Sequence, residues 1–208
     1  RLGLLASGRG SNLQAIIEAI ESGVLAAEMG VVLSNKKEAE ALERAKEHGI
    51  PAVFVDPKDH TSREAYDAVL CEILKKHHVE LVVLAGYMRL LTSSLIRPYE
   101  GRIINIHPSL LPAFQGLHAQ RQALVYGVKV SGCTVHFVDE KMDHGPVIAQ
   151  AAVPVMEDDN ESALAERILL EEHRLLPKVI QCYAEGRLKV EGRRVLLTQI
   201  LSPRSEDQ

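Results

Sequence analysis

The sequence predicts an α/β fold in which helices cover a doubly wound, mostly parallel sheet. Short apolar segments alternate with amphipathic ones along residues 1–100, the order that builds parallel strands joined by right-handed helical crossovers. The segment VELVVLAG (79–86) is apolar from Leu81 onward, which is typical of a strand in the middle of a parallel sheet. A glycine turn separates the first strand from the first helix. These features indicate a Rossmann-like core, to which the C-terminal part adds antiparallel strands, a long helix and a final hairpin.

The N-terminal elements follow from apolar spacing and from capping signals. Strands are expected at 2–7, 29–35, 50–56 and 79–86, and helices between them at about 11–20, 38–49 and 61–77. Ser11 with Gln14 fits a capping box at the first helix, and Thr61 with Glu64 fits another at the third.

The C-terminal elements are read in the same way. Strands are expected at 102–107, at 132–138 and after the Gly-Pro turn at 145–146. Helices are expected at 116–127 and 161–186, and a hairpin at 188–197. The strand 132–138 alternates in polarity, so we expect it to be half-buried, with His136 on the outer face in a structural role. Pro177 should kink or split the long helix, and Glu191–Gly192 should form the turn of the hairpin.

Length and composition favour one domain over residues 1–200, with halves at 1–100 and 101–200 and a polar, disordered tail at 201–208. The formal charge is −4, so neither nucleic acid nor an anionic membrane is an expected partner. The three cysteines show no pairing or metal-ligand spacing, and no segment reads as a membrane span or a signal peptide. We therefore expect reduced thiols and a cytoplasmic location, as a monomer or a homodimer.

The segment RIINIHPSLLPAF (102–114) is the strongest candidate for chemistry. Its start is β-branched and apolar, and Asn105 and His107 point to the same face because side chains alternate along a strand. Pro108 then ends the strand. Ligands of open α/β sheets bind beyond the carboxyl ends of the strands, so an amide and an imidazole at this place favour a catalytic over a purely structural role.

The glycine turn GRGSN (8–12) has two readings that the residues alone leave open. A helix amino terminus preceded by Gly8 and Gly10 can bind a phosphate through backbone N–H groups, with Ser11 and Asn12 as further donors. It can equally be a plain tight turn, because Leu13 stands where the dinucleotide fingerprint has its third glycine.

Other polar residues also have a structural alternative. The patch at 87–91 reads first as a small core cluster, and otherwise as one wall of a ring-binding pocket with Arg89 free for a carboxylate. Arg63 opposes the helix dipole in a first turn, so it should have another partner. Asp143 either caps its own turn or returns to the sheet end beside His107. The cluster 171–173 reads as solvated.

Four segments resemble one family. GRGSNLQA (8–15), LAGYMRLL (84–91), NIHPSLLP (105–112) and GCTVHFVDEKMDHGPVI (132–148) are together similar to the phosphoribosylglycinamide formyltransferases, folate-dependent enzymes of purine biosynthesis. The resemblance runs over nearly the whole chain. It implies transfer of a formyl group from the co-substrate 10-formyltetrahydrofolate to the amine of 5-phosphoribosylglycinamide, with no metal. Arg9, Gln115 and His144 depart from the family pattern without touching its functional positions.

The resemblance also implies roles for individual residues. The catalytic residues would be Asn105, His107 and Asp143. The residues that contact the ribonucleotide and its phosphate would be Gly10, Ser11, Asn12 and Glu172. The folate-binding residues would be Arg63, Met88, Arg89, Leu90, Leu91 and Asn105. For the patch at 87–91, this reverses the preference for a core cluster.

Three rival functions are weighed against this one. A 10-formyltetrahydrofolate hydrolase usually carries an extra domain before the first strand, and methionyl-tRNA formyltransferase needs a further RNA-binding domain. We expect neither in this chain. A non-catalytic folate- or nucleotide-binding module would be indicated by the loss of one of the three catalytic residues, and all three are present.

Overall fold

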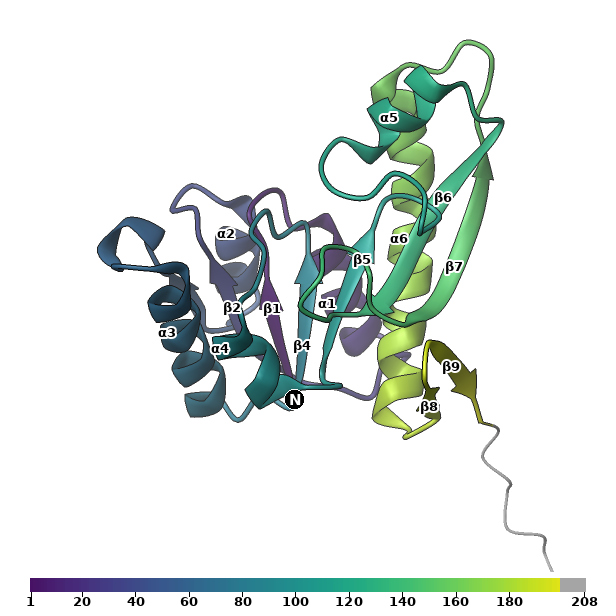
Figure 1. Cartoon of the computed structure of the whole chain (residues 1–208). Coiled ribbons are helices and arrows are strands. Elements are labelled where there is room, and N and C mark those ends of the chain that lie inside the picture. Colours follow the sequence, from purple (N-terminus) through teal and green to yellow (C-terminus); the bar gives the residue numbers. More distant parts are fainter. Residues whose placement is uncertain (199–208) are drawn as a thin grey trace, which may run out of the picture.

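A single sheet runs through the computed structural model, which describes residues 1–198. Within those residues the sheet has nine strands in the order β3-β2-β1-β4-β5-β6-β7-β9-β8 (Figure 1). The strands are β1 Leu2–Leu5, β2 Met29–Ser34, β3 Ala52–Phe54, β4 Leu81–Ala85, β5 Ile103–His107, β6 Val130–Phe137, β7 Val147–Pro154, β8 Leu188–Glu191 and β9 Arg194–Leu197. The first five are parallel, whereas β6 is antiparallel to both β5 and β7. The predicted doubly wound, mostly parallel α/β fold with added antiparallel strands is confirmed.

Helices cover both faces of this sheet. They are α1 Ser11–Glu21, α2 Glu40–Glu47, α3 Arg63–Lys76, α4 Ser93–Ile96, α5 Ala119–Tyr126 and α6 Glu161–Ala184, with short 3₁₀ turns at Pro57–Asp59 and Arg97–Tyr99. Helices α1, α2, α5 and α6 contribute to one buried cluster, and α3 and α4 contribute to the other. No helix within residues 1–198 combines the length and the apolar composition that a bilayer crossing requires.

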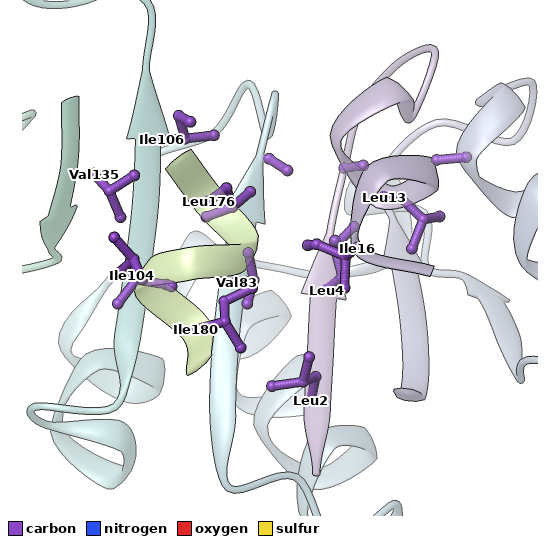
Figure 2. Close-up of a cluster of buried hydrophobic side chains, with 14 of the residues drawn as sticks. Leu2, Leu4, Leu13, Ile16, Val83, Ile104, Ile106, Val135, Leu176 and Ile180 are labelled. Atoms are coloured by element: carbon purple, nitrogen blue, oxygen red, sulfur yellow. The ribbon is translucent and has the colours of Figure 1, made fainter. Parts of the chain in front are cut away.

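The central strands supply both buried clusters because successive side chains alternate between faces. Leu4, Val83 and Ile104 join the cluster under α1 and α6, where Figure 2 shows Leu4 beside Ile16 of α1, and Val83 and Ile104 beside Leu176 and Ile180 of α6. Their chain neighbours belong to the cluster under α3. A strand buried on both faces has no polar side, which is why these segments read as continuous apolar runs.

The N-caps of α1 and α3 each lie one residue away from the predicted capping boxes. Helix α1 begins at Ser11 with Gly10 as its N-cap, in left-handed backbone (φ 73°), so Ser11 caps nothing. The N-cap of α3 is Ser62, not Thr61, and its side chain accepts a hydrogen bond from the Ala65 N–H. Both sites offer two adjacent residues that can cap, and the local sequence does not decide between them.

The C-terminal part contains three further corrections. Strand β6 is buried on both faces from Ser131 onward rather than half-buried, because α6 covers one face and the loop after β6 covers part of the other. Helix α6 continues through Pro177 as one element, so Pro177 does not split it. The hairpin turn is Gly192–Arg193, since Glu191 pairs with Arg194. The expected tail at 201–208 lies outside the described residues.

Candidate active site

Strand β5 places the two candidates of segment 102–114 at its carboxyl end. Asn105 and His107 lie on the same face, and His107 is buried with 5% of its surface exposed. Antiparallel pairing sets Asn105 opposite His136 and His107 opposite Thr134 on β6. The Leu111–Pro112 peptide bond in the following loop is cis.

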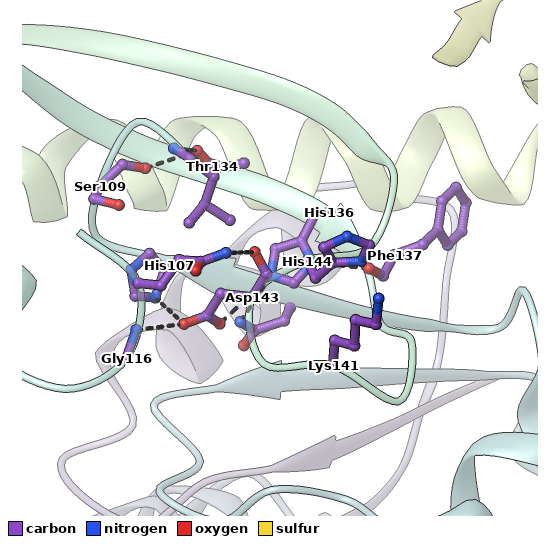
Figure 3. A network of polar contacts seen from close by, with 12 residues as sticks. His107, Ser109, Gly116, Thr134, His136, Phe137, Lys141, Asp143 and His144 are labelled. Atoms are coloured by element: carbon purple, nitrogen blue, oxygen red, sulfur yellow. Dashed lines mark hydrogen bonds and ion pairs between the residues drawn. The ribbon is translucent and has the colours of Figure 1, made fainter. Parts of the chain in front are cut away.

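The loop between β6 and β7 brings Asp143 back to this strand end. Asp143 Oδ2 lies 3.4 Å from His107 Nδ1 and accepts a 2.7 Å hydrogen bond from the Gly116 N–H (Figure 3). Asp143 adopts left-handed backbone (φ 47°), and its main-chain oxygen accepts a hydrogen bond from Gln115 Nε2 at 3.0 Å. The structure therefore brings together the three residues that the sequence separates by up to 38 positions, from 105 to 143.

Oxygen acceptors lie beside both ring nitrogens of His107. Its Nε2 lies 2.9 Å from the main-chain oxygen of Phe114, and its Nδ1 faces the Asp143 carboxylate. Both ring nitrogens thus face acceptors, and only the imidazolium donates from both. The 3.4 Å separation on the Nδ1 side is longer than an ordinary N–H···O bond, so that N–H remains available to a substrate oxygen.

His136 lies in the site, not on an outer face as the sequence suggested. Its Nδ1 donates to the main-chain oxygen of Phe137 at 2.8 Å, and its Nε2 lies 3.1 Å from Asn105 Nδ2. Burial lowers the pKa of His136, which keeps the ring neutral with an acceptor lone pair at Nε2. That lone pair holds one amide N–H of Asn105 and orients the other away from it. Alternation along β6 could not reveal this contact, because it depends on the pairing of β6 with β5.

A cavity of about 510 Å³ opens beside these groups. Its volume lies in the range of small-molecule sites. Its lining includes Leu84, Tyr87, Met88, Arg89, Leu90, Leu91, Asn105, His107, His136, Val138, Met142 and Asp143. The four predicted folate-binding residues at 88–91 therefore line the same cavity as the three catalytic candidates. Arg63 does not line it; its Nη2 donates to the Leu90 main-chain oxygen at 2.8 Å, the other partner that its position predicted.

The glycine turn after β1 forms a second polar area at the same edge of the sheet. An added Cβ at Gly10 would lie 2.8 Å from Ala41 Cα, so only glycine fits beside α2. Asn12 Nδ2 donates to Glu172 Oε2 at 2.7 Å, and Asn12 Oδ1 is buried with no partner. Glu172 is itself buried, and burial raises its pKa. The prediction that the cluster 171–173 is solvated is wrong for Glu172.

The two areas adjoin through Ser7. Its N–H donates to the Gly86 main-chain oxygen at 3.1 Å, and its hydroxyl accepts from the Met88 N–H at 2.9 Å. The turn that contains Gly10 thus begins against the loop that lines the cavity.

The sequence pattern of the family described as "Formyl transferase" matches residues 1–180. The chain belongs to the formyl transferase family. The resemblance drawn from the four sequence segments is thereby confirmed.

The chain is similar to named relatives of this family and to solved structures. A phosphoribosylglycinamide formyltransferase of Escherichia coli is 46% identical over 187 residues, which cover 90% of this chain and 88% of the relative. A trifunctional purine biosynthetic protein of Drosophila melanogaster is 48% identical over 188 residues, but the match spans only 14% of that protein's length. The crystal structure of a glycinamide ribonucleotide transformylase from Symbiobacterium toebii has a TM-score of 0.95 at 53% identity, covering 96% of this chain and 94% of that one.

The hairpin β8–β9 lies beyond the region that the formyl transferase pattern matches, yet it contacts the Asp143 loop. Arg193 Nη2 donates to the His144 main-chain oxygen at 2.7 Å, and Arg193 Nη1 lies 3.2 Å from the His144 ring. His144 Nδ1 pairs in turn with Asp139 at 2.8 Å. The hairpin therefore holds the loop that contains Asp143 partly through a main-chain oxygen.

Proposed function

We propose that the chain transfers the formyl group of 10-formyltetrahydrofolate to the amine of 5-phosphoribosylglycinamide. The observation that carries the proposal is the meeting of Asn105, His107 and Asp143 at one end of the 510 Å³ cavity. Amide and imidazolium donors beside a carboxylate suit acyl transfer to an amine, in which negative charge grows on a carbonyl oxygen. The carbon skeleton of a bicyclic ring fits against the apolar lining formed by Met88, Leu90 and Leu91.

The first chemical step is attack of the glycine amine on the formyl carbon. The carbonyl electron pair moves to oxygen as the C–N bond forms. Asn105 donates to that oxygen through the amide N–H that His136 leaves free, and His107 donates through Nδ1. Losing one such donor typically raises a barrier by roughly 3–4 kcal/mol.

The second step is departure of the folate. The ammonium formed by attack loses a proton, N10 of the folate gains one, and the bond between the formyl carbon and N10 breaks as the carbonyl re-forms. Asp143 stabilises the His107 imidazolium throughout because it keeps a negative charge 3.4 Å away. General acid–base assistance of this kind contributes about 10²–10⁴ in rate.

The ribonucleotide is proposed to occupy the second polar area. Gly10, Ser11 and Asn12 offer backbone and side-chain donors to its phosphate at the amino end of α1. Glu172 would accept from the ribonucleotide hydroxyls, and the unpartnered Asn12 Oδ1 provides a further acceptor there. Both substrates would then be held within one domain, proposed to span residues 1–200 in the cytoplasm.

The test separates transfer from its alternatives. The purified chain is incubated with 10-formyltetrahydrofolate, with and without phosphoribosylglycinamide, and tetrahydrofolate is followed with time. Tetrahydrofolate that forms only with the amine supports the transferase. Tetrahydrofolate that forms equally without the amine supports a hydrolase, and none in either case supports a binding module.

A further inference from the structure

The segment 86–92, here called the cavity loop, lines much of the proposed folate site but has little structure of its own. It joins the end of β4 to the start of α4, and the chain between these elements forms no helix or strand. Met88 and Leu90 are 59% and 52% exposed, so they gain little from packing against the protein. Contacts from elsewhere must therefore determine the shape of this loop.

Helix α3 supplies most of those contacts from one face. Residues 63, 66 and 67 are spaced i, i+3 and i+4, so their side chains lie together on the first two turns of the helix. Arg63 Nη2 donates to the Leu90 main-chain oxygen at 2.8 Å. Tyr66 accepts a hydrogen bond from the Tyr87 hydroxyl at 3.3 Å.

Asp67 makes the most unusual of these contacts. Its carboxylate is only 2% exposed and accepts a 2.5 Å hydrogen bond from the Thr92 N–H, at the point where the cavity loop meets α4. Burial raises the pKa of this carboxyl group. An apolar residue would be less costly to bury at this position, so the carboxylate indicates a requirement for an acceptor.

Tyr66 also orients the charged side chain of Arg89, which belongs to the cavity loop. The Arg89 guanidinium lies over the Tyr66 ring, with Arg89 Cζ 4.9 Å from the ring centre. The ring face attracts the cation and limits the directions that Arg89 can take. Tyr66 is 1% exposed and, like Arg63 and Asp67, does not line the cavity.

We propose that Arg63, Tyr66 and Asp67 of α3 are positioning residues that hold the cavity loop in the conformation that binds the folate substrate. They act through Leu90, Tyr87 with Arg89, and Thr92, and Tyr66 and Asp67 do so without touching the ligand. This proposal rests on the proposed function, because it takes the folate as the occupant of the cavity. It adds loop positioning to the folate contact predicted for Arg63.

The test uses variants that remove one contact each. Asp67→Ala removes the acceptor of the Thr92 N–H, whereas Asp67→Asn retains an oxygen that can accept it. Tyr66→Phe removes only the hydroxyl. Val69→Ala is the matched control, because Val69 lies on the same helix, is 37% exposed and belongs to none of these contacts.

The expected readout is a selective loss of folate binding. In Asp67→Ala the KM for 10-formyltetrahydrofolate and the Kd for tetrahydrofolate should both rise about tenfold, the effect of a lost hydrogen bond to a charged group. Asp67→Asn should restore most of the affinity, and Tyr66→Phe should weaken binding about threefold. The kcat at saturating folate and the KM for the ribonucleotide should stay within about twofold of wild type.

The outcomes separate this proposal from the proposed function. If all variants bind tetrahydrofolate like the wild type, or if kcat and both KM values change together, the positioning role is wrong. If the wild type binds tetrahydrofolate without transferring formyl, the proposed reaction is wrong, and weakened binding in the variants would still support the positioning role. Should Asp67→Ala fail to fold, Tyr66→Phe decides the question, and a wild type that binds no tetrahydrofolate overturns both proposals.

Discussion

Replacing Asp143 by asparagine tests the proposed mechanism most directly. Asparagine matches the shape of aspartate, tolerates the left-handed backbone at this position, and keeps an oxygen that can accept from the Gly116 N–H. What the substitution removes is a negative charge 3.4 Å from His107 Nδ1. The variant therefore isolates charge from loop geometry.

The magnitude follows from this separation and from burial. The two side chains are 6% and 12% exposed, so solvent screens the pair weakly. With an effective dielectric constant of about 20, charges at this distance attract by roughly 5 kcal/mol. Part of this attraction is offset by the cost of burying the two charges. Losing the donation by His107 to the oxyanion costs roughly 3–4 kcal/mol, which sets the scale of the expected effect. We expect kcat to fall by about 10²–10³.

The assay measures kcat and both KM values for formyl transfer. The KM for phosphoribosylglycinamide should change by less than about twofold, because Asp143 lies away from Asn12 and Glu172 in the second polar area. His107→Ala should show the same pattern. Glu157→Gln is the control, since its carboxylate pairs with Lys129 at the surface and does not line the cavity. If Asp143→Asn retains more than a third of wild-type kcat, the role assigned to its charge is wrong.

Three further predictions concern the edges of the site. Because burial holds the pKa of Glu172 above its ordinary value of 4.5, the unfolded chain loses this proton first, and the folded state loses stability as pH rises above 4.5. Glu172→Gln should therefore melt a few degrees higher than wild type at pH 7–8, with the difference shrinking towards pH 4.5, while binding the ribonucleotide more weakly. Gly10→Ala should raise the KM for the ribonucleotide at least about tenfold and destabilise the fold by more than about 1–2 kcal/mol, measured against Gly23→Ala, which has a similar φ of 75° but open space around it. Arg193→Ala should change the free energy of unfolding by less than about 0.5 kcal/mol, because the residue is exposed, yet lower kcat several-fold by releasing the loop that contains Asp143.

The local sequence predicted well where the strands lie. It did not predict which residues lie opposite each other on neighbouring strands. The alternation of side chains along residues 103–107 placed Asn105 and His107 on one face without any knowledge of the fold. The same rule applied to residues 133–137 separated His136 from the apolar face, but it could not show that the polar face of β6 meets the cavity. That depends on the antiparallel register that sets Asn105 opposite His136. Register is a property of two strands, and one strand's sequence does not contain it.

Local patterns also failed to show which carboxylates are buried. The helical spacing of Glu172 and of Asp67 is compatible with a solvated face, and in both cases the partner lies elsewhere in the chain. Asn12 is 160 positions from Glu172, and Thr92 is 25 positions from Asp67. The residue type does not determine burial in such cases, because the same carboxylate is solvated or buried according to which loop packs over it.

The buried polar residues nevertheless reveal the site without reference to any relative. Within residues 1–198 they are Ser7, Asn12, Ser34, Asp67, His107, Ser109, Ser131, Thr134, His136 and Glu172. All of them except Ser131 lie at or beyond the carboxyl ends of β1, β2 and β5, lie opposite β5 on β6, or bond to residues that follow β1 and β4. Hydrophobic burial alone would favour apolar residues at both edges of the sheet equally. Their concentration at one edge means that burying polar groups lowers the stability of the fold at this edge and not at the opposite one. Substitutions that remove a buried charge, such as Glu172→Gln, should therefore stabilise the fold only by weakening the site.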